Sequence, residues 1–124
     1  MRDVTRLARV WVPLMWLVAL ASLSCGNIVV VGPEGTLVGA PCTVDGQCDK
    51  TCLIDDRHFP SGMCTVPCTT DAECPSGSVC VAHNGGQCVF ACAGDTSCQG
   101  FGRGYVCGSS ERAAGGTASV CLVP

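Results

Sequence analysis

The chain reads CTTDAEC from Cys68 to Cys74, and the pattern C-x-x-D-x-x-C recurs in CTVDGQC (Cys42–Cys48) and CAGDTSC (Cys92–Cys98). Each stretch is followed by a third cysteine, at Cys52, Cys80 or Cys107, and by a fourth, at Cys64, Cys88 or Cys121. Repetition at a period of about 25 residues is typical of tandem modules. The sequence therefore predicts three cysteine repeats, at 42–67, 68–91 and 92–124.

The cysteine content predicts a disulfide-stabilised fold. The chain has 13 cysteines in 124 residues, and a four-cysteine unit suggests two disulfides. The spacing leaves the three possible pairings within each unit open. Asn84-Gly85 is a strong signal for a hairpin turn, and Ser61-Gly62 and Gly115-Gly116 fit the same role in the outer repeats. We expect a small disulfide-rich protein of three modules with short β-hairpins and little helix.

The N-terminal segment has the composition of an export signal. Arg2, Arg6 and Arg9 precede an apolar run over residues 10–23, which is short for a permanent membrane span. We therefore expect residues 1–24 to be a lipoprotein signal peptide; an uncleaved anchor helix is the alternative.

Cys25 is the one cysteine outside the array. The sequence around it, ASLSCG, resembles a lipobox, and this resemblance implies that Cys25 is lipidated and becomes the mature N-terminus. The rival fates are a free thiol, an intermolecular disulfide or ordinary signal cleavage nearby. Residues 25–41 would then be the lipidated N-terminus and a Gly- and Pro-containing tether, unless the β-branched run at 28–31 adds an edge strand to the first module.

The repeated aspartates are the most suggestive polar feature. Asp45, Asp71 and Asp95 occupy the same place in their repeats, which favours a cap on a single turn through a backbone N–H two or three residues on. The alternative is calcium ligation, with further carboxylates from Asp49, Asp55, Asp56 and Glu73.

Composition and spacing argue against several chemistries. The sequence has no C-x-x-C knuckle of the kind that zinc sites and thioredoxin-like redox motifs use, so we expect no metal and no cofactor. His58 and His83 fall in different repeats and are interpreted as solvated loop residues, and we expect no catalytic residues and no enzyme. A net charge of −3 without a basic stripe argues against binding to nucleic acid.

The export signal, the lipobox-like Cys25 and the C-x5-C repeats together resemble the cysteine-rich lipoproteins of myxobacteria and related bacteria. This resemblance implies a non-catalytic, lipid-anchored protein of the cell envelope, with a binding or structural role and an unidentified protein partner. Gly26 after the cysteine hints at the outer membrane or cell surface. The segment 71–80 is also similar to whey-acidic-protein-like modules, although it lacks their adjacent cysteine pair. The alternative functions are an exported protease inhibitor that uses the loop 55–61 and a calcium-dependent adhesion module.

Overall fold

The computed structural model describes residues 30–124. The expected signal peptide at 1–24 and the lipidation site Cys25 lie outside this part of the chain. Within residues 30–124, none of the helices has the length and apolar character needed to cross a bilayer.

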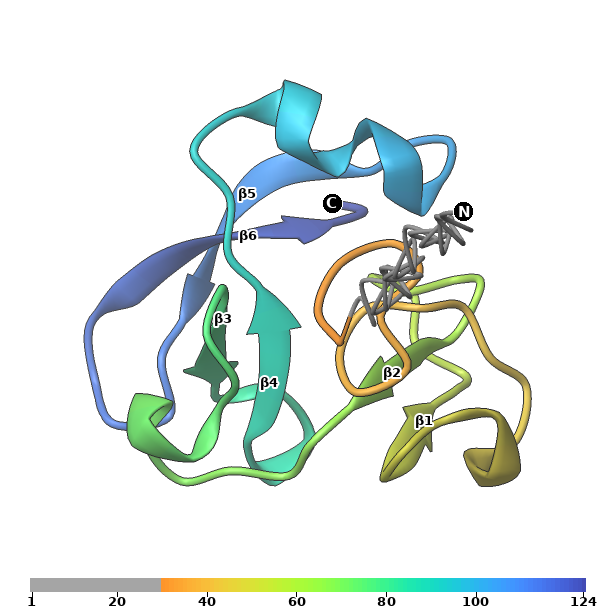
Figure 1. The fold of residues 1–124 in the computed structure, drawn as a ribbon. Coiled ribbons are helices and arrows are strands. Elements are labelled where there is room, and N and C mark those ends of the chain that lie inside the picture. Colours follow the sequence, from red (N-terminus) through yellow and green to blue (C-terminus); the bar gives the residue numbers. More distant parts are fainter. Residues whose placement is uncertain (1–29) are drawn as a thin grey trace, which may run out of the picture.

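Three two-stranded antiparallel hairpins form the framework (Figure 1). Strand β1 (Thr51–Leu53) pairs with β2 (Met63–Thr65), β3 (Ser78–Val81) with β4 (Gln87–Phe90), and β5 (Val106–Glu111) with β6 (Thr117–Leu122). The expectation of a small disulfide-rich fold with short hairpins and little helix is confirmed. Its helical elements in residues 30–124 are the short 3-10 helices η1 (Asp45–Gln47), η2 (Asp71–Glu73), η3 (His83–Gly85) and η4 (Asp95–Phe101).

The disulfides follow one rule in all three modules. The first cysteine bonds to the third and the second to the fourth, which gives the pairs Cys42–Cys52, Cys48–Cys64, Cys68–Cys80, Cys74–Cys88, Cys92–Cys107 and Cys98–Cys121. The third and fourth cysteines sit directly opposite each other in each hairpin, for example Cys80 opposite Cys88. Both therefore reach back to the two cysteines of the C-x-x-D-x-x-C stretch, which lie on either side of η1 and η2, whereas Cys98 lies within η4. Each helix is thereby held against its hairpin.

The turns agree with the sequence in two modules and differ in the first. Asn84 and Gly85 take positive φ angles of 46° and 84° between β3 and β4, and Gly115 and Gly116 do so between β5 and β6. In the first module Gly62 has a φ of 71°, but it ends a long connection that starts after Leu53. This connection folds inward because it carries Phe59, which is 3% exposed in the core.

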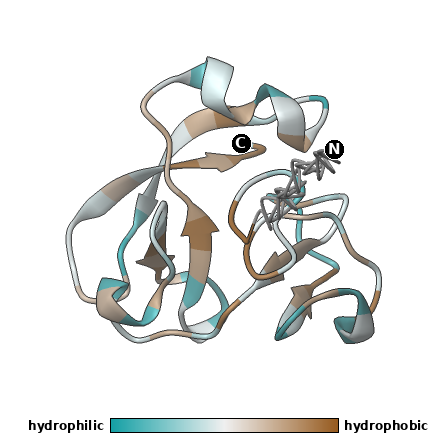
Figure 2. Ribbon diagram, in the orientation of Figure 1, coloured by the Kyte–Doolittle hydropathy of each residue, from teal (hydrophilic) through white to brown (hydrophobic). Residues whose placement is uncertain are grey.

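One core is shared by the three modules. Its buried residues include Leu53, Phe59 and Met63 from the first module, Val81 and Val89 from the second, and Tyr105 and Val120 from the third. Figure 2 shows apolar residues along β4 and the C-terminal part of β6, which are joined by the bridge between Ala91 and Val120. Pooling the apolar side chains gives each module a burial that about 25 residues could not achieve alone.

The segment at 30–41 is folded rather than a free tether. Val38 is fully buried against Cys68, Cys80 and Cys88, and it forms a β-bridge with Val31. On the free edge of β2, the N–H of Gly39 donates to the carbonyl of Cys64 (2.9 Å) and the N–H of Cys64 donates to Ala40 (2.8 Å). The apolar character of Val31 and Val38 explains the difference, because packing them removes apolar surface from water.

Candidate functional site

The repeated aspartates hold the backbone of their own modules. One carboxylate oxygen (Oδ1) of Asp45, Asp71 and Asp95 accepts a hydrogen bond from the N–H of Cys52, Cys80 and Cys107, at 2.8 Å in each case. The cap expected at these residues is wrong, because each aspartate is the first residue of its 3-10 helix and not its N-cap, and its carboxylate binds outside the helix. The donor is the third cysteine of the module, 7, 9 or 12 residues further on, because the 1–3 disulfide brings that cysteine beside the helix.

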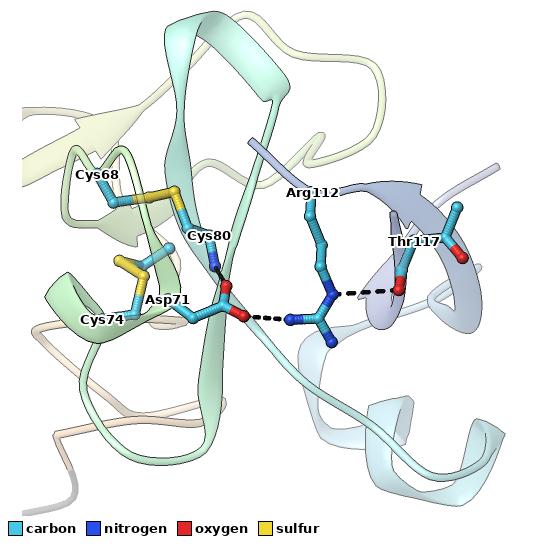
Figure 3. A network of polar contacts seen from close by, with 7 residues as sticks. Cys68, Asp71, Cys74, Cys80, Arg112 and Thr117 are labelled. Carbon is cyan, nitrogen blue, oxygen red and sulfur yellow. Dashed lines mark hydrogen bonds and ion pairs between the residues drawn. A yellow bond between two sulfur atoms is a disulfide. The ribbon is translucent and has the colours of Figure 1, made fainter. Parts of the chain in front are cut away.

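Asp71 has a second task, which links the second module to the third (Figure 3). Its other carboxylate oxygen pairs with Nη1 of Arg112, whose Nε donates to the carbonyl of Thr117 at 3.1 Å. The pair is partly exposed, with 34% of the Arg112 side chain and 44% of the Asp71 side chain accessible to solvent. No local sequence pattern points to this contact, since Arg112 lies 41 residues away in another repeat.

Glu73 serves as a backbone cap. Its carboxylate accepts hydrogen bonds from the hydroxyl and the N–H of Thr69 and from the N–H of Thr70. The hydroxyl contributes most to a lowered pKa of Glu73, followed by the backbone N–H of Thr69. Gln47 takes the equivalent position in the first module and accepts from the N–H of Thr43 at 2.6 Å. Two candidate calcium ligands, Asp71 and Glu73, therefore already accept several protein hydrogen bonds.

His58 and His83 come together, in contrast to the separate solvated residues that the sequence suggested. Their ring centroids are 5.8 Å apart, and both residues are half-buried. Asp56 connects them, because its Oδ1 accepts from the backbone N–H of His58 at 2.8 Å and its Oδ2 pairs with Nε2 of His83. Nδ1 of His58 lies 2.7 Å from the carbonyl oxygen of Val123. The cluster thus joins all three modules.

The Asp56 carboxylate is held in its charged form by this arrangement. Burial alone would raise the pKa of Asp56, but hydrogen bonds from the His83 side chain and from the backbone of His58 oppose it. The charges of the two imidazoles act in the same direction as the hydrogen bonds, and the net result is a lowered pKa of Asp56. A half-buried carboxylate with these partners is a fixed acceptor that orients His83.

A cavity of about 280 Å³ lies beside the two imidazoles. One side of it is the face of the β5–β6 hairpin that carries Val106, Gly108, Val120 and Leu122. A side chain at Gly108 would approach Cδ1 of Leu122 to 3.0 Å, so glycine keeps this part of the cavity open. The first and second modules complete the lining with His58, Phe59, Val81 and His83. The cavity therefore combines apolar walls with two polar rings at the junction of the modules.

Clustered cysteine sulfurs have a simple explanation in the part of the chain described. Each module has one group of three sulfur atoms that lie within 4.8 Å of one another. The groups are Cys42, Cys48 and Cys52; Cys68, Cys74 and Cys88; and Cys92, Cys98 and Cys121. Every sulfur in these groups is bonded to another in a disulfide. The clusters are a geometric consequence of the 1–3, 2–4 pairing, and disulfide sulfurs do not supply the thiolates that metals bind.

No family model, curated protein or solved structure matches the chain. The six disulfides and the three short hairpins by themselves define the class, which is that of small disulfide-rich proteins. The candidate site centres on Asp56, His58 and His83. Sequence reasoning missed this cluster because its residues belong to two different repeats.

Proposed function

We propose that this protein is a non-catalytic lipoprotein of the cell envelope, in which Cys25 carries the lipid anchor and the three modules form a binding or structural domain. The observation that supports this proposal most directly is that all 12 cysteines of residues 30–124 form disulfides within their own modules. Such dense cross-linking suits an oxidising compartment outside the cytoplasm. It also leaves Cys25 as the odd cysteine, and lipidation gives that thiol a chemical role.

An acylated Cys25 would attach the domain firmly to a membrane. Each buried CH₂ contributes roughly 0.8 kcal/mol, so a single chain binds reversibly whereas two or three chains on one residue anchor stably. The cavity where the modules meet supports a binding role, because ligand sites occur preferentially where structural units join and combine apolar walls with a few polar groups. The cross-links keep such a site in shape without a large core.

The anchor is tested by metabolic labelling of the producing bacterium with a fatty acid that carries an alkyne. The full chain should incorporate the label, and the C25A variant should lose it together with its tight membrane association. The S24A variant is the matched control, because alanine is as small as serine beside the cleavage point and should leave labelling intact. An unlabelled wild-type chain, or a label that persists in C25A, would contradict the proposal.

A further inference from the structure

The backbone carbonyl of Val123 fixes which ring nitrogen of His58 carries the hydrogen. Its Nδ1 lies 2.7 Å from the carbonyl oxygen of Val123, and a carbonyl can only accept, so Nδ1 must carry the hydrogen. In the neutral ring Nε2 then has a free electron pair. The surroundings agree, because Nε of Arg57, which can only donate, lies 3.4 Å from this Nε2.

The ring of His83 is fixed in the opposite sense. Its Nε2 faces the Asp56 carboxylate, which is an acceptor when ionised, so Nε2 carries the hydrogen and Nδ1 has the electron pair of the neutral ring. Asp56 cannot turn away freely, since its other oxygen accepts from the backbone N–H of His58 at 2.8 Å. Each imidazole thus has one nitrogen tied to an oxygen acceptor. Nδ1 of His83 keeps its electron pair for a ligand, whereas Nε2 of His58 accepts from Arg57 and can bind a metal only after the exposed Arg57 side chain moves away.

We propose that His58 and His83 form a two-imidazole site for a divalent transition-metal ion of the Cu²⁺ or Zn²⁺ type at the junction cavity. A metal-binding histidine almost always donates its other ring N–H to a carboxylate or a backbone carbonyl, and here Asp56 and Val123 supply one of each. An ion about 2.0 Å from two imidazole nitrogens sets the ring centroids ~5–6 Å apart, depending on the ligand angle. The observed separation of 5.8 Å, with the ring planes at 78° to each other, is compatible with this range.

The remaining coordination positions of such an ion would be open to water or to a small anionic ligand, because both rings line the cavity. Imidazole ligands favour copper, nickel and zinc, whereas calcium and magnesium require oxygen ligands, so the expected order is Cu²⁺ above Ni²⁺ and Zn²⁺ with no binding of Ca²⁺. Arg57 weakens metal binding, because its positive charge repels the ion and its Nε contacts Nε2 of His58. The site is independent of the lipid anchor.

The proton positions can be tested without a metal. A long-range ¹H–¹⁵N spectrum of the intact mature chain, with its disulfides formed, distinguishes the two neutral tautomers of each imidazole. The expected result is the Nδ1–H tautomer for His58 and the Nε2–H tautomer for His83. The reverse tautomer at either residue would leave the wrong nitrogen free and would overturn the proposal.

The metal itself is tested with Cu²⁺ on the same protein, by isothermal titration for affinity and by electron paramagnetic resonance for the coordinated nitrogens. One ion per chain with two coordinated imidazole nitrogens is expected. Either H58Q or H83Q should leave one coordinated nitrogen, and the double variant should leave none. Two nitrogens that persist in H83Q, or no saturable binding to the wild type, would refute the site.

Two further variants separate a metal site from a merely structural cluster. D56N keeps both rings but removes the charged acceptor of His83, and it should weaken Cu²⁺ binding by ~10–100-fold while two nitrogens still coordinate. R57Q removes the opposing charge and should strengthen binding. Equal affinities in the wild type, D56N and R57Q would show that neither residue acts on a metal and would contradict the assignment.

Discussion

At the scale of single residues, the aspartate of each C-x-x-D-x-x-C stretch does the most for the fold. It accepts the N–H of a cysteine on the neighbouring strand, and in the second module this cysteine, Cys80, is 1% exposed. A buried N–H without an acceptor costs roughly 1–3 kcal/mol, whereas a partly exposed ion pair contributes about 0–1 kcal/mol. The hydrogen bond to Cys80 should therefore matter more than the ion pair between Asp71 and Arg112.

This difference predicts the effects of two substitutions at Asp71. D71A removes the acceptor and should lower the free energy of unfolding by about 1–2 kcal/mol. D71N keeps an oxygen for Cys80 and loses only the charge, so it should cost less than about 1 kcal/mol. Denaturant unfolding with the disulfides intact measures both values. Equal losses in the two variants would mean that Asp71 stabilises the fold through its ion pair with Arg112 and not through the hydrogen bond from the N–H of Cys80.

Tyr105 gives the fold a dependence on alkaline pH. Burial raises the pKa of Tyr105, and the charge of Asp56 adds to this, although a hydrogen bond with the backbone of Ser61 acts in the opposite direction. The unfolded chain would release the proton at about pH 10, before the folded chain does. Stability linked to Tyr105 is therefore complete below about pH 10 and is lost as the pH rises through the folded value.

Absorbance of the phenolate reports this group alone, because the chain has 1 tyrosine. The titration midpoint should lie above pH 10 in the folded protein and should fall to about 10 after unfolding. The Y105F variant should lose less stability than the wild type between neutral and alkaline pH. A native midpoint at or below 10 would contradict the burial of Tyr105.

At the scale of elements, each hairpin carries two cysteines opposite each other, and each of these bonds to one of the two cysteines in the C-x-x-D-x-x-C stretch of its module. The sequence predicted the hairpins and the four-cysteine units, because turn residues and cysteine spacing are local signals. It could not select the 1–3, 2–4 pairing, since all three pairings are compatible with the spacing. The antiparallel register places Cys80 opposite Cys88, and in the structure Cys80 bonds to Cys68 and Cys88 to Cys74.

Removing one of these clamps should destabilise the second module by a predictable amount. The Cys74–Cys88 disulfide joins residues 14 apart, and closing a loop of this size contributes roughly 3 kcal/mol by restricting the unfolded chain. The C74A/C88A double variant should lose about that much and keep the other disulfides. Peptide mapping under non-reducing conditions checks the pairing, and unchanged stability would show that shared packing alone holds the module.

At the scale of the whole molecule, the modules form one body rather than three beads. Thr65 in the first module is 1% exposed, and its hydroxyl donates to the carbonyl of Cys88 in the second module at 2.8 Å. The N–H of Val123 in the third module donates to the backbone carbonyl of His58 in the first at 3.0 Å. The sequence did not reveal this interlocking, because residues such as His58 and Val123 lie 65 positions apart and no local pattern connects them. The inward fold of the long loop before β2, driven by Phe59, creates the cluster at the junction.

The shared core predicts that a single module cannot fold alone. Val81 and Val89 of the second module are 1% and 0% exposed in a cluster completed by the other two modules. A peptide of residues 68–91 should therefore give a mixture of disulfide isomers on oxidation, whereas residues 30–124 should give the 1–3, 2–4 pairing in every module. A peptide that recovers the native pairing in high yield would show that each module is autonomous.

We propose an exported chain that is anchored through Cys25 and held together by disulfides within its modules. The intact mass of the protein from native membranes, alkylated without prior reduction, tests both halves in one measurement. The expected mass is that of residues 25–124 plus acyl groups, lower by the 12 hydrogens of six disulfides and without any alkyl adduct. Alkyl adducts on the array cysteines, or a mature chain without acyl groups, would contradict it.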